Sequence, residues 1–97
     1  MSELHVVATI PAKPEAADAI REALQTLATA SRGEEGCLSY DLYESAAAPG
    51  TFVTVERWTG QDALDAHMQT PHIGAALGAA DGALSGDIAI HPLVPVE

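Results

Sequence analysis

The sequence predicts an α+β fold of the ferredoxin-like kind, with elements in the order β-α-β-β-α-β around one antiparallel sheet. Three observations support this prediction: four short β-type segments, a strongly periodic helix after the first of them, and a second helical region before the last. In such a fold the helices cover one face of the sheet. Because the predicted strands are apolar on both faces, we expect a second copy of the chain to cover the other face.

The first strand and the first helix have the clearest patterns. Residues 4–10 are apolar or β-branched except for His5, and Pro11 ends the strand. Residues 14–32 form the helix, since Pro14 suits a first helical turn and Gly33 a C-terminal stop. The apolar stripe of this helix comprises Ala17, Ile20, Leu24, Leu27, Ala28 and Ser31.

The remaining elements follow from alternation and from capping signals. Residues 37–44 and 51–58 read as a hairpin, because the loop between them ends in the turn pair Pro49-Gly50. Thr59 is the expected N-cap of a helix that reaches about residue 69, and Thr70-Pro71 begins another that reaches residue 80. The fourth strand covers residues 87–93, and the first strand should lie between the third and the fourth.

Length and charge limit the possible functions. The 97 residues are enough for one domain, for which we expect the bounds 1–97 with a core over 3–92. The net charge of −10 disfavours nucleic acid and anionic membranes as partners. The single Cys37, the absence of a signal segment and the absence of an apolar run of about 20 residues predict a cytoplasmic protein.

The third strand carries the first candidate site residues. Phe52, Thr54, Glu56 and Trp58 share one face of it. If the helices cover that face, the Glu56 carboxylate needs a partner. It either makes structural hydrogen bonds or orients a histidine or a substrate hydroxyl. Trp58 is either part of the core or a flat wall for an aromatic ligand.

Two histidines lie near the break between the later helices. His67 is close to the end of one helix and His72 is in the first turn of the next, five positions on and beyond Pro71. This is not the i, i+4 spacing of a helical metal pair, so these two residues alone predict no metal site. Each is a capping or surface histidine, or both join Glu56 and Trp58 in a pocket.

Other candidates are less specific. Tyr40 and Tyr43 point to opposite faces of their strand, and Tyr43 is the one we expect to face the pocket. His5 and His91 lie on adjacent strands, where they face each other or are simply edge residues. The sequence has no glycine-rich nucleotide motif, no G-x-S-x-G, no C-x-x-C and no H-E-x-x-H, so we expect no cofactor.

Three runs, EEGCLSYDLYES, PGTFVTVERW and ALDAHMQTPHI, resemble the antibiotic biosynthesis monooxygenase (ABM) domain of the dimeric α+β barrel superfamily. The resemblance extends over about residues 3–92. It implies a homodimer whose sheets face each other, with a pocket between the sheet and the helices of each subunit. For the oxygenase members it implies oxidation of phenols or hydroquinones by O2 without metal or flavin. By position, Trp58 and His67 would line the pocket, with Glu56 and His72 nearby.

The resemblance leaves several functions open. The first hypothesis is a monooxygenase of small aromatic substrates, with Trp58 as ring wall, His67 as base or oxyanion partner, and Glu56 and His72 as its support. The further substrate contacts would be Tyr43, Phe52 and Leu77. The second is a non-catalytic binding or scaffold dimer whose pocket is filled by Phe52, Trp58 and Leu77.

Two other activities of the resembling family are disfavoured. Haem-degrading relatives use a histidine near the position of Leu77, and the sequence has none there. The small number of basic residues also disfavours isomerases of phosphorylated compounds. A cavity of about 300 Å³ or more beside Trp58 would favour an enzyme over a scaffold.

Overall fold

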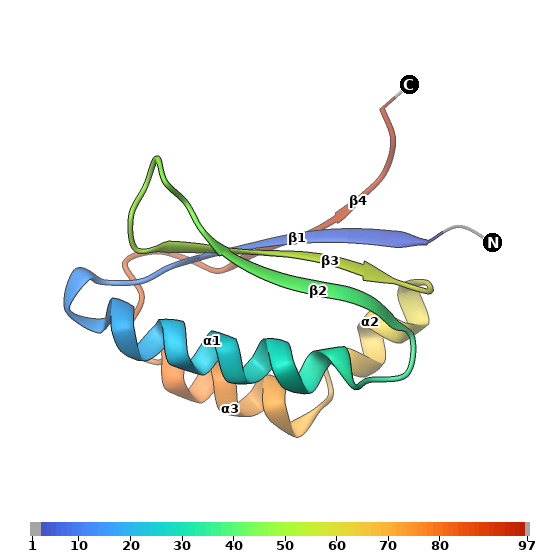
Figure 1. Ribbon diagram of the computed structural model, residues 1–97, viewed down its shortest axis with the longest axis horizontal. Coiled ribbons are helices and arrows are strands. Elements are labelled where there is room, and N and C mark those ends of the chain that lie inside the picture. The colour runs from blue at the N-terminus through green and yellow to red at the C-terminus, as the bar shows by residue number, and fades with distance from the viewer. Residues whose placement is uncertain (1–2, 97) are drawn as a thin grey trace.

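The strands form one antiparallel sheet with the predicted neighbours. The computed structural model describes residues 3–96. Its sheet has the order β2-β3-β1-β4, so β1 lies between β3 and β4 as expected (Figure 1). The strands are β1 Leu4–Pro11, β2 Cys37–Glu44, β3 Thr51–Trp58 and β4 Ala89–Leu93. The predicted fold class, an α+β ferredoxin-like arrangement, is confirmed.

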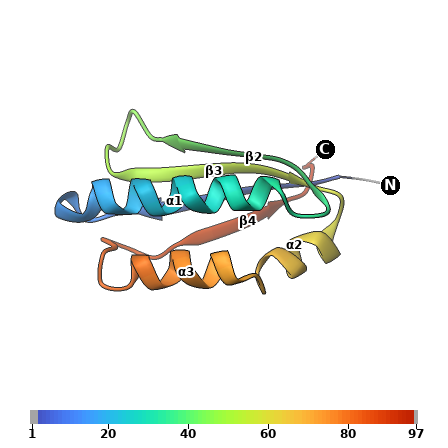
Figure 2. The ribbon, with the colours of Figure 1, turned by 60° about the horizontal axis from the view of Figure 1, so that its bottom comes forward.

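All helices lie on one face of this sheet. A 3-10 turn, Pro14–Ala16, leads into α1, and α1 packs beside α3 under the strands (Figures 1 and 2). The α-helices are α1 Ala17–Arg32, α2 Gln61–His67 and α3 Pro71–Ala80. The two short helices α2 and α3 follow β3 directly, which brings their junction under the end of the sheet where β3 finishes.

Several boundaries differ from those predicted: α1 begins at Ala17, after the 3-10 turn, and α2 ends at His67 rather than near residue 69. The N-cap of α2 is Gly60 rather than Thr59, and it makes no side-chain cap hydrogen bond. Thr59 is engaged elsewhere, since its backbone N–H donates to the carbonyl of Gly36 at 2.9 Å. The fourth strand begins at Ala89 and is two residues shorter than predicted. By contrast, Thr70 caps α3 as expected, because its side chain accepts a hydrogen bond from the Ile73 N–H.

The core lies between the helices and the sheet. The predicted stripe of α1 is buried except for Ala17, which is only partly covered. From the sheet, Trp58 and Phe52 are 0% and 1% exposed, and Val6 is fully buried as well. Burial of one large apolar side chain contributes about 1.5–3 kcal/mol, so this layer holds the helices against the strands.

The opposite face of the sheet is uncovered. Val7 pairs with Val55 and Thr9 with Val53 on this face. Val55, Tyr43 and Leu93 are each roughly half exposed there. The face therefore carries apolar groups that nothing in residues 3–96 shields, as the two-sided strand pattern predicted.

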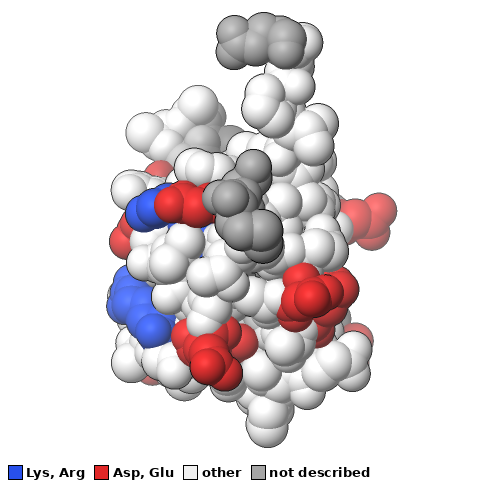
Figure 3. All heavy atoms as spheres, turned by 90° about the vertical axis from the view of Figure 1, so that its right-hand side faces the viewer, with Lys and Arg blue, Asp and Glu red and all other residues white. Residues whose placement is uncertain are grey.

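Charged side chains are spread over the surface. On the face shown in Figure 3, acidic groups stand apart from one another on an uncharged surface and no basic cluster is seen. Arg57 and Arg21 are engaged with Glu3 and Glu44 at 2.7 and 2.8 Å. Within the described part of the chain, no helix has the length and apolarity needed to span a bilayer.

Candidate functional site

A small cavity lies between the sheet and helices α1 and α3. Its volume is about 70 Å³. Its polar lining consists of Tyr40, Thr54, Glu56 and His67. The remaining lining is apolar and includes Leu24, Leu64, Ile73 and Leu77, of which Leu77 is half exposed at the rim. The site is therefore an apolar chamber with one polar wall, which suits a mostly apolar ligand bearing one or two hydroxyl groups.

Glu56 is a buried carboxylate with two hydrogen-bond donors. It is 4% exposed. The Thr54 hydroxyl donates to its Oε2 at 2.6 Å and the Trp58 indole N–H donates to its Oε1 at 2.9 Å. No Lys or Arg within residues 3–96 forms an ion pair with it. Hydrogen bonds therefore take the place of the counter-ion that a buried carboxylate would otherwise need.

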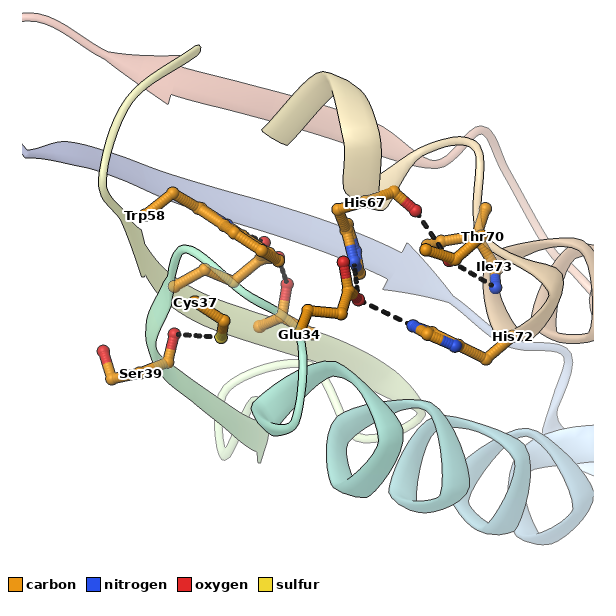
Figure 4. Close-up of polar contacts among 10 residues, drawn as sticks. Glu34, Cys37, Ser39, Trp58, His67, Thr70, His72 and Ile73 are labelled. Atoms are coloured by element: carbon orange, nitrogen blue, oxygen red, sulfur yellow. Dashed lines mark hydrogen bonds and ion pairs between the residues drawn. The ribbon is translucent and has the colours of Figure 1, made fainter. Parts of the chain in front are cut away.

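Glu34 is the residue that holds both candidate histidines. Its Oε2 lies 2.6 Å from His67 Nδ1 and 2.6 Å from His72 Nε2 (Figure 4). An ionised carboxylate can only accept, so each of these ring nitrogens donates an N–H. In the neutral form of the His67 ring, the second nitrogen, Nε2, then carries a lone pair. The hydrogen bond found for the His67 ring among the described residues is the one through Nδ1, and His67 lines the cavity.

The turn after α1 explains why Glu34 reaches the histidines. Gly33 caps α1 and the Glu34 N–H donates to the Ser31 carbonyl, so Glu34 follows the helix directly. Gly36 then has a φ of +89°, and a Cβ there would lie 2.7 Å from the Ala63 side chain on α2. Only glycine permits this conformation at so close an approach. The contact brings the turn against α2, and with it the carboxylate to His67.

Thr70 fixes the second imidazole relative to the first. Its hydroxyl donates to the His67 carbonyl at 2.7 Å and accepts from the Ile73 N–H at 3.4 Å. It thereby joins the end of α2 to the start of α3, where His72 is the second residue. The two imidazole centroids are 6.0 Å apart, with the Glu34 carboxylate between the rings (Figure 4).

Aromatic rings pack around His67. The Trp58 ring lies 4.6 Å from the His67 ring and the Tyr40 ring lies 5.7 Å from it, centroid to centroid. Both of these aromatic neighbours of His67, Trp58 and Tyr40, are buried. His67 itself is 2% exposed, so its rotamer is determined by packing as well as by Glu34.

Several predicted site residues occupy other places than expected. Trp58, Phe52 and His72 are near the site but are not among the residues that line the cavity. The tyrosine at the cavity is Tyr40, which is 3% exposed, whereas Tyr43 is 56% exposed on the open face of the sheet. The expectation for Tyr43 was wrong because Tyr40 pairs with Glu56 across the hairpin, which puts those two side chains on the same face.

The cavity is also smaller than an enzyme of large ring systems would need. Its 70 Å³ is well below the roughly 300 Å³ that we set as favouring an enzyme. The carboxylate that orients His67 is Glu34, not Glu56. His5 and His91 are not directly opposed, since His5 pairs with Leu93 and His91 with Val7. Leu77 and His67 do line the cavity, as expected.

Sequence reasoning missed Glu34 and Tyr40. A signal for Tyr40 existed, because a hairpin closed by Glu44 and Phe52 places residue 40 opposite residue 56. No such signal existed for Glu34, since it lies in a turn and its contact with the histidines depends on packing across the fold. Together with His67 and His72 it forms a group whose three ligand atoms lie within 4.8 Å of one another.

Two ionisable groups near the site remain protonated over the physiological range. Burial, and secondly the Glu56 charge, raises the pKa of the Tyr40 hydroxyl. Burial, followed by the charges of Glu34 and Glu56, raises the pKa of the Cys37 thiol. Tyr40 is therefore a neutral hydroxyl at the cavity, and Cys37 is a poor candidate for a nucleophile because the thiolate is disfavoured.

The fold and the site define a small ferredoxin-like protein with an apolar cavity and a carboxylate-bound histidine at its polar wall. Residues 4–79 match the family described as antibiotic biosynthesis monooxygenase, ABM. The chain belongs to the antibiotic biosynthesis monooxygenase family, as the resemblance of the three sequence runs predicted.

Two relatives illustrate the similarity. "Putative monooxygenase Rv0793" of Mycobacterium tuberculosis is 36% identical over 96 residues, which is 99% of this chain and 94% of the relative. The structure of Rv0793 matches with a TM-score of 0.89 over 99% of this chain and 97% of its own. The structure of PA3566 from Pseudomonas aeruginosa matches with a TM-score of 0.90 at 31% identity, over 100% and 97% of the two chains.

Proposed function

We propose that this protein is a cofactor-independent monooxygenase that oxidises a small phenol or hydroquinone with O2. One observation carries the proposal: Glu34 binds the Nδ1 side of His67, and His67 lines an apolar cavity. Family membership supports it, as does the similarity to a relative named as a monooxygenase. His67 is the base, Glu34 is the residue that positions it, and Glu56 accepts a hydrogen bond from a substrate hydroxyl.

The arrangement can activate a phenol by removing its proton. His67 Nε2 accepts the hydroxyl proton, and the imidazolium that forms is stabilised by the Glu34 carboxylate at 2.6 Å. The phenolate is the electron donor to O2. One oxygen atom of O2 becomes bonded to a ring carbon. The other leaves as water with two protons from the substrate, and the substrate supplies the four electrons that reduce O2. Apolar walls such as Leu24 and Ile73 keep bulk water from the reacting groups.

The volume of the cavity requires that the site opens to admit a ring. A cavity of 70 Å³ is about half of one known to hold benzene. Helix α3 is the element that we expect to move, since it carries the half-exposed Leu77 at the rim. Gly74 and Gly78 lie in the same helix and weaken it. The cavity therefore represents the closed form of the site.

Consumption of O2 with a panel of phenols, hydroquinones and naphthols tests this function. We expect wild-type protein to take up O2 with at least one of these compounds. His67→Gln should reduce the rate by about 100-fold or more, because the base is lost. Trp58→Phe should reduce it less, because it removes only one donor to Glu56. Gln25→Ala, on the exposed side of α1, is the control. Equal rates in the wild type and His67→Gln would reject the assignment of the base.

A second function, binding without turnover, is favoured by the small cavity. In that case His67 and Glu34 are structural, and a ligand would be held by the apolar lining and Tyr40. Titration with the same compounds under N2 separates the two functions. Binding that Leu77→Trp abolishes, without O2 uptake in the wild type, would establish this alternative.

We propose that the working unit is a homodimer joined through the open face of the sheet. Proteins of this family are typically homodimers. Val55 and Leu93 would be shielded in the contact, which removes the exposed apolar groups from water. The single free cysteine, Cys37, favours a cytoplasmic location for this enzyme.

A further inference from the structure

We infer that Glu34, His67 and His72 form a binding site for a divalent transition-metal ion of the Zn²⁺ class. Two imidazole nitrogens and one carboxylate converge there, with all three ligand atoms within 4.8 Å of one another. Two histidines and one carboxylate form a recurrent donor set for Zn²⁺ and Fe²⁺, and they leave further positions for water. The site lies beside the cavity rather than in it, because His72 and Glu34 do not line the cavity.

The three ligands come from three separate elements and are held in place before any ion arrives. Glu34 is in the turn after α1, His67 ends α2 and His72 begins α3 (Figure 4). Thr70 hydrogen-bonds both the His67 carbonyl and the start of α3, so the two rings are fixed relative to each other. Such support from surrounding hydrogen bonds is what orients metal ligands in proteins.

Charge at the cluster also favours a cation. Within residues 3–96, the ion pairs of Glu34 are with the two imidazoles, and no Lys or Arg neutralises it. One oxygen, Oε2, accepts both N–H groups, while Oε1 forms no hydrogen bond with a described residue. A divalent ion would replace two weak positive contacts with one strong one, and Oε1 remains free to act as a second ligand atom.

Local movements of the three ligands are needed to form the coordination geometry. A Zn²⁺ ion at about 2.0–2.2 Å from each ligand atom places those atoms roughly 3–3.5 Å apart. The two N···O distances are now 2.6 Å, so the carboxylate has to withdraw by about 1 Å or less from the rings. The two ring nitrogens, which lie within 4.8 Å of each other, have to take the same spacing. Glu34 is 13% exposed and His72 is 24% exposed, which leaves a path for the ion from solvent.

The site has a consequence for the cavity, and this consequence rests on the proposed function. If Nδ1 of His67 binds the metal, the one proton of the neutral ring moves to Nε2. The nitrogen proposed to act as the base then becomes a donor and can no longer accept a substrate proton. Bound Zn²⁺ should therefore inhibit the oxidation, although the binding itself needs no turnover.

Titration of metal-stripped protein with Zn²⁺, against a chromophoric chelator, tests the site directly. We expect one Zn²⁺ per chain in the wild type. Glu34→Gln and His72→Ala should each weaken binding at least tenfold, because each removes a ligand. Glu22→Gln, which changes an exposed carboxylate on α1, should leave the affinity unchanged. No binding in the wild type, or equal affinity in His72→Ala, would overturn the proposal.

Two further measurements keep the outcome decisive. Far-UV circular dichroism checks that each variant is folded, and His72→Gln replaces His72→Ala if the latter is not. The absorption spectrum of bound Co²⁺ should change in Glu34→Gln and not in Glu22→Gln. Zn²⁺ binding without O2 uptake would refute the proposed oxidation and leave the metal site standing. O2 uptake by a protein that binds no Zn²⁺ would refute the site alone.

Discussion

Replacing Thr54 with valine should destabilise the protein through Glu56. The Thr54 hydroxyl donates to Glu56 Oε2 at 2.6 Å, and the two residues are 2% and 4% exposed. A hydrogen bond to a charged group contributes about 1.5–3 kcal/mol, and no water replaces the lost donor at a buried site. Valine has nearly the same shape, so little cavity is created. We therefore expect the free energy of unfolding of Thr54→Val to fall by about 2 kcal/mol, and its Tm by roughly 8–15 °C.

Urea denaturation at one fixed protein concentration measures this change, because the stability of the proposed dimer would depend on concentration. Thr51→Val, at the partly exposed start of the same strand, is the matched control and should stay within about 0.5 kcal/mol of the wild type. The double variant with Glu56→Gln should be non-additive by roughly 0.5–3 kcal/mol. Thr54→Val with wild-type stability, and additive with Glu56→Gln, would show that the hydrogen bond does not hold the carboxylate.

Three more predictions concern other parts of the site. Gly36→Ala should lower the free energy of unfolding more than Gly82→Ala does. Both glycines have a positive φ, where an alanine is strained by about 1–3 kcal/mol, but only at Gly36 does the added Cβ also meet Ala63. Equal urea midpoints of the two variants would refute this. Burial raises the pKa of the Tyr40 hydroxyl above its usual value of ~10. The folded protein is therefore progressively destabilised above about pH 10, where the hydroxyl ionises in the unfolded chain but stays protonated in the folded one. The Tm of Tyr40→Phe should fall less than that of Tyr43→Phe between about pH 9 and 11. Leu77→Trp should fill the cavity mouth and lower ligand affinity about tenfold or more, and unchanged affinity would place the entrance elsewhere.

The order of elements was predictable because each depends on local pattern. The two-residue period of the strands and the stripe of α1 are visible in the sequence, and Pro14, Gly33 and Thr70 act at the boundaries where they were expected. Thr59 is not the cap because its neighbour Gly60 has an extended backbone and occupies the N-cap position, so α2 begins one residue later than predicted. The capping residues of α2 compete locally, and the pattern alone does not decide between them.

The site was only partly predictable because its geometry depends on contacts between distant segments. Glu56, Trp58 and His67 were grouped correctly from strand alternation and helix position, and Trp58 indeed donates to Glu56. Glu34 reaches His67 across 33 positions of sequence, through the contact of Gly36 with Ala63. No periodicity marks such a residue. The face of Tyr40 could have been found from the hairpin register, which alternation within a single strand does not give.

The protonation of His67 tests the central claim most directly. Long-range ¹H–¹⁵N NMR spectra of metal-free protein distinguish the two ring nitrogens of a neutral histidine. If Glu34 binds Nδ1–H and leaves Nε2 to the cavity, His67 will show a protonated Nδ1 and an unprotonated Nε2, and Glu34→Gln will shift this balance. A His67 ring whose proton resides on Nε2 in the wild type would contradict the account, because the cavity would then meet a donor and not a base.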